Sequence, residues 1–390
     1  MLFDKVLEKI LKNQELKKGG GHIAPPFPFK RLADYYPVID KGHSIGILAG
    51  TGVGKSTLLR YMFIYYLYEF YKKTGYKTRI FYFPLEDNKE KVYLYFICNY
   101  LHREKGIKIS MQELTSKGER ELPDFIVDYI KEAREYFAEF EQIVTVVDGY
   151  TEPKQIYKIL ESYALKTGVI NEYTVNIEGK GEEKQLIYES DTHTFVLIDN
   201  MANIDQGKEH DSERAAMVEL AKIYIRERLC NFFKFTCILL LQNDFATERA
   251  QFSTNGKPIM SKVEPSLASI GEAKTVARSM HVIFSLFDPS KYDFIRYPAV
   301  SEENAEKAYD LDILGNKFRA FRILKNNEGE NGVRIGLLMN PWTGEFEELP
   351  PPDSPEMKQV YQEFKQQKMK TVKSKGAIIF EEDYLEEAPF

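Results

Sequence analysis

The sequence predicts an α/β fold in which a mostly parallel, twisted sheet carries helices on both faces and ends in antiparallel strands. From about residue 40, short β-rich runs alternate with longer stretches of helical period. A glycine-rich turn joins the first of these strands to a long helix. The last β-rich runs follow one another too closely for crossover helices, which favours antiparallel pairing.

The individual elements follow from apolar runs and their punctuation. Strands are expected at residues 43–49, 79–83, 143–147, 195–198, 236–241, 281–287, 318–324 and 334–339. Helices are expected at residues 3–17, 56–73, 88–103, 123–140, 152–167 and 213–229. Residues 169–192 interrupt the alternation, and they predict a β-hairpin inserted at the surface and turning at Gly179-Lys180-Gly181.

Three parts are expected along the chain. Residues 1–30 predict an amphipathic linker helix, whose apolar stripe begins at Phe3 and Val6, followed by a glycine- and proline-rich hinge. Residues 31–350 predict one enlarged core. After a proline triplet, residues 351–390 predict a charged tail, with six lysines against one glutamate in 357–375 and then only acidic charges in 377–390.

Composition excludes several classes of protein. With 390 residues, 43% hydrophobic and 29% charged, the chain is not collagen-like, low-complexity or wholly disordered. Its net charge of −6 argues against indiscriminate coating of nucleic acid, but a mildly acidic protein can still concentrate basic residues on one surface. Three cysteines without metal-ligand spacing favour a reducing, intracellular compartment. No apolar run approaches the roughly 20 residues of a membrane span, and no signal peptide is recognised. A cytoplasmic location is expected.

The strongest local pattern is a nine-residue turn between the first core strand and its helix. It reads Ala49-Gly50-Thr51-Gly52-Val53-Gly54-Lys55-Ser56-Thr57, and this strand–turn–helix context is the one that a P-loop requires. Glycines let backbone N–H groups wrap an anion, and the N-terminus of the helix adds its positive dipole end. We expect Lys55 to contact the β- and γ-phosphates of a nucleotide such as ATP and Ser56 to bind Mg²⁺.

Polar side chains end three further strands. Asp199 follows an apolar strand and is expected to hold Mg²⁺ through water, and Glu86 ends the strand after the P-loop helix, where a carboxylate can polarise an attacking water. Gln242 ends a third strand with an amide suited to sensing the γ-phosphate. Each alone is an ordinary polar strand terminus. Together they meet at the carboxyl edge of the sheet, where α/β proteins bind ligands.

These motifs resemble the RecA-fold motor of superfamily-4 replicative helicases, the DnaB type and its phage relatives, over roughly residues 30–350. Members often carry alanine at the first P-loop position, as Ala49 does here. The resemblance extends to six further segments: Pro84-Leu85-Glu86, residues 146–153, Asp199-Asn200-Met201, Leu241-Gln242-Asn243-Asp244, the channel-lining segment 265–273, and the closing strands at 322–325 and 332–334. The usual N-terminal domain, a helical collar or a primase, has no counterpart in about 30 residues here.

The resemblance implies an ATP-dependent DNA helicase that translocates on single-stranded DNA as a ring, expected to be a hexamer, with ATP and Mg²⁺ bound between subunits. It also implies a residue that reaches the γ-phosphate on the neighbouring subunit. The family places an arginine there, whereas this chain has Asn327, so Arg322, Lys325 and Arg334 are the candidates for that role. High tyrosine and lysine usage together with the missing collar fits a phage-encoded protein acting in a host cytoplasm.

Residues 247–274 are the expected DNA-contacting loop. The candidates in it, basic residues and two from the channel-lining segment, are Arg249, Lys257, Lys262, Gly271, Glu272 and Lys274. Contacts to the DNA backbone read no sequence, so binding is expected to depend strongly on salt and little on base composition.

Two alternatives stay open at this stage. One is a RecA-type recombinase that forms filaments, since the core fold is shared. The other is a weakly hydrolysing loader or scaffold in a replisome, which Asn327 favours. The chain ends Glu-Glu-Ala-Pro-Phe, similar to the acidic tips of bacterial single-stranded-DNA-binding proteins, so the C-terminal tail is a candidate docking segment for a replisome partner.

Overall fold

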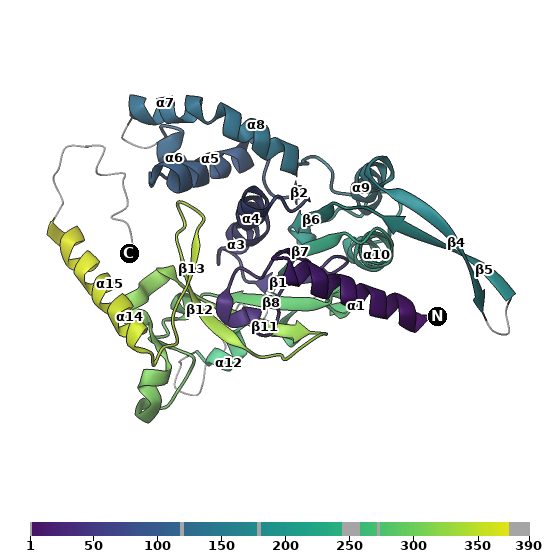
Figure 1. The fold of residues 1–390 in the computed structure, drawn as a ribbon. Helices are drawn as coiled ribbons and strands as arrows, with labels where there is room; N and C mark the ends of the chain where they lie inside the picture. The colour runs from purple at the N-terminus through teal and green to yellow at the C-terminus, as the bar shows by residue number, and fades with distance from the viewer. Residues whose placement is uncertain (1, 118–120, 178–180, 244–257, 271–273, 374–390) are drawn as a thin grey trace.

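A nine-stranded sheet forms the centre of the molecule (Figure 1). The computed structural model describes residues 2–117, 121–177, 181–243, 258–270 and 274–373. The strands lie in the order β13-β12-β11-β8-β1-β7-β6-β2-β3. Their bounds are β1 Ser44–Ala49, β2 Thr78–Pro84, β3 Val144–Val146, β6 His193–Asp199, β7 Thr236–Gln242, β8 Val282–Phe287, β11 Phe318–Asn326, β12 Arg334–Met339 and β13 Phe346–Glu348.

Strand direction divides the sheet into two parts. From β8 to β3, neighbouring strands pair in parallel, whereas β11, β12 and β13 pair antiparallel at one edge. Strands β1, β6 and β8 are buried along their whole length, as a parallel sheet covered on both faces requires. The predicted fold class is therefore confirmed.

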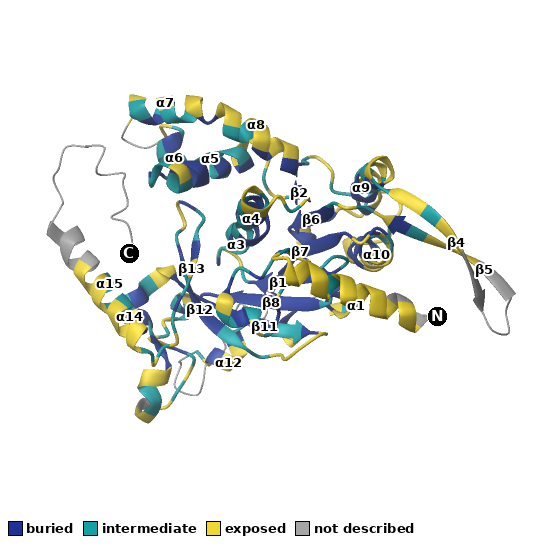
Figure 2. Ribbon diagram, in the orientation of Figure 1, coloured by how far each residue is buried: buried dark blue, intermediate teal, exposed yellow. Residues whose placement is uncertain are grey.

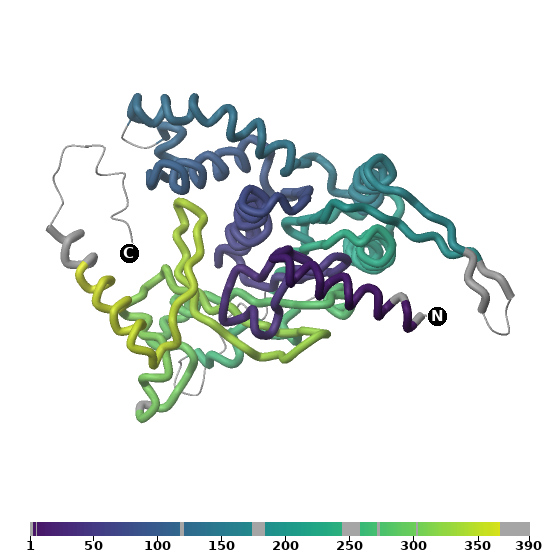
Figure 3. Tube along the Cα trace, viewed as in Figure 1, coloured from purple at the N-terminus to yellow at the C-terminus, as the bar shows by residue number. Residues whose placement is uncertain are grey.

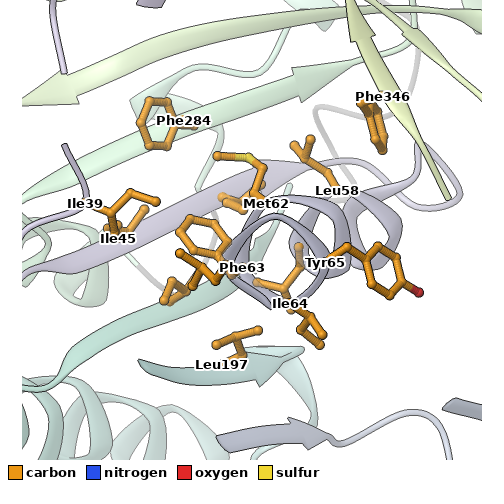
Figure 4. Packing of buried hydrophobic residues seen from close by; sticks show 14 of the residues in the cluster. Ile39, Ile45, Leu58, Met62, Phe63, Ile64, Tyr65, Leu197, Phe284 and Phe346 are labelled. Carbon is orange, nitrogen blue, oxygen red and sulfur yellow. The ribbon is translucent and has the colours of Figure 1, made fainter. Parts of the chain in front are cut away.

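Helices cover both faces of the sheet (Figure 1). One layer contains α3 Lys55–Arg60, the π-helical η1 Tyr61–Tyr65, α4 Tyr66–Thr74, α5 Lys89–Lys105 and α8 Arg134–Ile143, with α6 Met111–Leu114 and α7 Asp124–Glu132 beyond it. The other contains α9 Pro153–Thr167, α10 Glu213–Glu219, the π-helical η3 Leu220–Phe232 and α13 Lys274–Ser279. Figure 4 shows the first layer's core, where Met62 and Phe63 pack with Ile45, Leu197 and Phe284 of the sheet.

Three predicted helices differ in detail from the observed ones. The helices expected at 56–73 and 213–229 are continuous, but each contains a π-helical stretch, η1 or η3, that an apolar pattern does not distinguish from α-helix. The helix expected at 123–140 is two helices, α7 and α8, which meet at the buried Ala133.

The inserted hairpin is present where the sequence predicts it. Strands β4 Val169–Ile177 and β5 Gly181–Glu189 pair antiparallel in their own two-stranded sheet. The hairpin projects away from the main sheet in Figure 1. A second small pair, β9 Arg296–Tyr297 and β10 Tyr309–Asp310, lies in the C-terminal half.

The N-terminal helix, α1 Leu2–Lys18, exposes its apolar stripe (Figure 2). Phe3 is 68% exposed and Ile10 is 58% exposed. Within the described part of the chain, no helix is long and apolar enough to cross a membrane. The segment after α1 returns to the body along the C-terminal strands (Figure 3), where the α2 helix Lys30–Ala33 places Arg31 within hydrogen-bonding distance of the Leu349 carbonyl.

Part of the predicted charged tail, residues 355–373, is a helix. Residues Pro355–Lys373 form the helix α15, and its buried Met357 packs in a cluster with α14 Leu311–Leu314. The Tyr361 hydroxyl accepts a hydrogen bond from the Asp310 N–H at 2.8 Å. The residues of α15 that pack in this cluster are Met357, Val360, Tyr361 and Phe364. Their spacing is that of one helical face, which the high charge of the segment conceals.

We expect Met357→Ala to lower the free energy of unfolding by about 2–4 kcal/mol, because it opens a cavity where the side chain is fully buried. Chemical denaturation measures this. The matched control is Lys358→Ala, which changes an exposed neighbour on the same helix and should alter stability by less than about 0.5 kcal/mol. Equal stability of the two variants would show that α15 contributes nothing to the fold.

Candidate functional site

The glycine-rich turn lies where β1 gives way to α3. Ala49 is the last residue of β1 and is buried, and Lys55 is the first residue of α3. Gly52 and Gly54 have φ angles of 65° and 104°, in the left-handed region that favours glycine. A Cβ on Gly54 would also lie 2.5 Å from the Met339 sulfur of β12. Both glycines are therefore needed for the observed course of the turn.

Lys55 and Ser56 are the first two residues of α3, directly after the glycine-rich turn. The Lys55 ammonium donates to the carbonyls of Ala49 and Gly50, each at 3.3 Å, so its charge lies over the turn itself. The Ser56 hydroxyl donates to Asp199 Oδ1 at 2.9 Å. Thr57 follows in the first turn of α3. The structure thus brings two predicted Mg²⁺ ligands, Ser56 and Asp199, into direct contact.

A chain of buried polar groups holds the Asp199 carboxylate. The Tyr82 hydroxyl donates to Asp199 Oδ2 at 2.7 Å, and Arg60 donates to the Tyr82 oxygen at 3.3 Å. Burial raises the pKa of the Asp199 carboxyl, while the hydrogen bond from Tyr82, the charge of Arg60 and the hydrogen bond from Ser56 lower it. Burial and the adjacent carboxylate raise the pKa of Tyr82 well above its ordinary value, so its hydroxyl remains a donor.

The Ser56–Asp199 pair fits a magnesium ion by the chemistry of its donors. Mg²⁺ prefers hard oxygen ligands and is bound by one or two protein groups together with substrate phosphates and water. A hydroxyl and a carboxylate beside a phosphate-binding turn are such a set. Among the described residues, no cluster of three or more His, Cys, Asp or Glu side chains forms a separate metal site.

A single amide joins the other predicted residues. The Asn200 side-chain N–H₂ donates to Glu86 Oε1 at 2.9 Å and to Gln242 Oε1 at 3.2 Å. Gln242 in turn donates to the Thr51 hydroxyl at 3.1 Å. Strand register explains the meeting, because Pro84 lies opposite Asp199 and Ala49 lies opposite Gln242. Glu86, Gln242 and the turn therefore form one hydrogen-bonded unit.

Asn200 was not among the predicted site residues, although it stands directly after Asp199. Asn243, the residue after Gln242, donates its backbone N–H to the Ala49 carbonyl at 3.3 Å. Asn243 also pairs with Ile270 as an isolated bridge and accepts a hydrogen bond from the Ser269 hydroxyl at 3.1 Å. The end of β7 thus links the turn to Ser269 and Ile270, near the C-terminal end of the expected DNA-contacting loop.

The three candidates for a trans-acting residue lie on the antiparallel edge. The Lys325 ammonium donates to the carbonyls of Ala277, Arg278 and Met280 at the end of α13, the nearest at 2.6 Å. Arg322 lies opposite Arg334 in the β11–β12 pair. Because β11 runs antiparallel to β8, Lys325 lies opposite Ile283, toward the end of the sheet away from Ala49. The described structure does not bring these three residues to their own chain's glycine-rich turn.

The DNA-binding candidates are only partly within the described structure. Lys262 lies in the short helix α12 Met260–Val263, Lys274 is the first residue of α13, and both are exposed. Arg249, Lys257, Gly271 and Glu272 fall outside the described residues, as does the Glu-Glu-Ala-Pro-Phe end of the chain.

Comparison with solved structures identifies similar folds. The chain superposes on a DnaB-like replicative helicase, solved in a study of its interactions with primase, with a TM-score of 0.60 and 14% identity over 87% of this chain and 67% of that one. It also superposes on a solved ATPase domain with a TM-score of 0.58 and 14% identity over 89% of this chain and 98% of that one. No protein-family model matches the chain, and comparison with curated protein sequences also finds no match.

At such low identity these likenesses establish the fold alone. The fold is RecA-like, and its solved structural neighbours include a DnaB-like replicative helicase. The resemblance expected from the motifs is thus confirmed at the level of structure.

Proposed function

We propose that the chain is an ATP-dependent replicative DNA helicase motor that translocates on single-stranded DNA as a ring, a hexamer of identical copies. The observation that carries the proposal is the hydrogen-bonded unit in which Asn200 joins Glu86 to Gln242 and Gln242 joins the P-loop at Thr51. A purely structural turn has no need to tie a carboxylate to an amide from another strand. The RecA-like fold supports the same reading.

Each residue of the site has one role in nucleotide binding or hydrolysis. Backbone N–H groups of the P-loop and the Lys55 ammonium bind the β- and γ-phosphates. Ser56 and Asp199 would hold Mg²⁺, which when bound supplies positive charge to the phosphate oxygens. Glu86 orients and polarises the attacking water. Gln242 senses the γ-phosphate through its side-chain amide, whose oxygen accepts a hydrogen bond from Asn200.

The route from hydrolysis to DNA runs through β7. Gln242 contacts the P-loop, and its neighbour Asn243 is bonded to Ser269 and Ile270. A change at the γ-phosphate would therefore move the part of the DNA-contacting loop that contains Ser269 and Ile270. Lys262 and Lys274 lie within that loop, and cations there would bind phosphates of one strand with strong salt dependence. We propose that this motor acts in the cytoplasm and that its C-terminal tail docks a replisome protein.

Hydrolysis and unwinding in the presence of DNA test the proposal. We expect the wild-type protein to hydrolyse ATP with Mg²⁺, to do so faster with single-stranded DNA, and to separate a forked duplex. Electron microscopy with a non-hydrolysable ATP analogue and single-stranded DNA should show closed rings. ATP hydrolysis that DNA does not stimulate, without unwinding in any oligomeric state, would refute the helicase function. Open filaments would instead favour a RecA-type recombinase.

A weakly hydrolysing loader or scaffold is the second candidate, and a specific observation favours it. The Lys325 ammonium is engaged by three backbone carbonyls of its own chain, and the family's arginine position is Asn327, whose N–H is bonded to the His281 carbonyl. An arginine acting in trans accelerates related NTPases by about 10³–10⁵-fold. Normal ATP affinity with negligible turnover in the assembled, DNA-bound state would decide for this candidate.

A further inference from the structure

Two cations from the C-terminal half of the chain contact backbone carbonyls of the P-loop. Arg319, near the start of β11, donates from Nε to the Val53 carbonyl at 2.7 Å. Lys291, on the short helix η5 Pro289–Tyr292 that follows β8, donates to the Thr51 carbonyl. The two carbonyls belong to alternate residues of the same turn. Neither cation is the P-loop lysine, and the sequence motif does not contain them.

One buried carboxylate connects these two cations. Asp288 Oδ2 lies 3.2 Å from Arg319 Nη1, and each of the two side chains is only 5% exposed. Asp288 Oδ1 accepts hydrogen bonds from the Ser290 N–H at 3.1 Å and the Ser290 hydroxyl at 2.6 Å. These bonds form the start of the helix that carries Lys291. The remaining Arg319 bonds go to the carbonyls of Asn316 and Phe318, at 2.7 Å each, so the guanidinium is held in one orientation.

Because of the geometry of the peptide unit, cations that hold these carbonyls also fix the direction of the neighbouring N–H groups. In a trans peptide the C=O and the N–H of the same unit point in opposite directions. Holding the Thr51 and Val53 carbonyls outward therefore aims the N–H groups of Gly52 and Gly54 inward. A cation on the carbonyl also polarises the amide, which strengthens the N–H as a donor. Inward N–H groups are what a phosphate bound in such a turn requires.

We propose that Arg319, Asp288 and Lys291 are positioning residues that pre-form the phosphate-binding face of the P-loop from its outer side. This inference rests on the proposed nucleotide function and names the device that orders the site before the nucleotide arrives. The ligand that benefits is the polyphosphate of a nucleotide, because the aimed groups are backbone donors for anionic oxygens. This three-residue bracket acts through the loop backbone and contacts no reacting atom.

Lys291→Ala is the decisive variant, because the side chain is exposed and its loss leaves the buried Arg319–Asp288 pair intact. We expect about tenfold weaker binding of a fluorescent ATP analogue and of its ADP counterpart, the size of one charge-assisted hydrogen bond. The unfolding temperature without nucleotide should not change. At saturating ATP, kcat should stay within about threefold of wild type, so that the loss appears in KM.

Two further variants and a control complete the test. Lys291→Arg, which keeps a cation within reach of the Thr51 carbonyl, should bind nucleotide nearly as well as wild type. Lys307→Ala removes an exposed lysine outside the bracket and should have no effect on affinity. Arg319→Lys keeps the charge beside Asp288 but loses the fork of donors, and it should weaken binding as well. If Arg319→Lys fails to fold, the Lys291 series still decides.

The outcomes separate this inference from the proposed function. If wild-type protein binds nucleotide and Lys291→Ala binds it equally well, the positioning role of the three-residue bracket is refuted. The proposed function is then unaffected. An equal loss of affinity in Lys291→Ala and Lys291→Arg would also refute the positioning role, because the cation would then not be the cause. Wild-type protein that binds neither ATP nor ADP would overturn both.

Discussion

Replacing Lys55 by alanine is expected to abolish ATP hydrolysis and every activity that depends on it, while the protein stays folded. Lys55 is partly exposed at the first position of α3, and its ammonium lies against the carbonyls of Ala49 and Gly50. A nucleotide in the P-loop would draw that charge onto its phosphates. Removing a group that stabilises transition-state charge typically costs about 10²–10³-fold or more in rate, and here it also removes binding energy.

Steady-state hydrolysis, nucleotide binding and circular dichroism measure the three parts of this expectation. Alanine is the best helix former, so α3 should persist and the unfolding temperature should stay close to wild type. Lys73→Ala is the matched control, an exposed lysine near the end of α4 in the same continuous helix, and should hydrolyse ATP normally. Hydrolysis by Lys55→Ala within about tenfold of wild type would be too small a loss for a phosphate-binding lysine.

The sequence predicts that the polar strand ends meet, because parallel strands end at one edge of the sheet. Glu86, Asp199 and Gln242 each follow an apolar run, and strand pairing brings them together without any need to know which helices lie between. The role of Asn200 in joining these residues is not predicted by strand order. Its position beside Asp199 was visible, but its bonds to Glu86 and Gln242 depend on side-chain directions that spacing does not reveal.

Arg319 and Lys291 could not have been found in this way. Their contacts to Val53 and Thr51 span 266 and 240 residues of sequence, and no local pattern distinguishes them from other cations. The buried Arg319–Asp288 pair depends on where β11 joins the sheet. Long-range pairing of this kind is decided by tertiary structure, whereas a motif records only what neighbours along the chain do.

In the C-terminal helix, by contrast, the sequence does contain a helical pattern of apolar residues, but the high charge of the segment hides it. Met357, Val360, Tyr361 and Phe364 have helical spacing, and all four pack in the cluster beside α14. The lysines between them dominate any average over the segment, so composition alone predicts only a charged tail. Charged side chains on the outer face of a docked helix are ordinary. Periodicity was therefore the better guide here than net charge.

Glu86→Gln is expected to separate nucleotide binding from hydrolysis. The substitution preserves the shape of the side chain, and its amide oxygen can still accept the hydrogen bond that Asn200 donates to Glu86 Oε1 at 2.9 Å. Only the negative charge and the ability to take a proton are lost. Because positioned general bases contribute about 10²–10⁴-fold, kcat should fall by that amount. The affinity for ATP should change by less than about threefold, since no phosphate contact is removed.

Single-turnover hydrolysis beside equilibrium binding distinguishes this role from a structural one. Glu90→Gln is the matched control, because Glu90 is an exposed glutamate in the first turn of α5, four residues along the chain, and should keep full activity. The Glu86→Gln protein should hold ATP without cleaving it and, in the proposed ring, should bind single-stranded DNA without unwinding a fork. A kcat within about threefold of wild type would mean that the carboxylate is not the base. The Glu86–Asn200 contact would then serve only to order the end of β2.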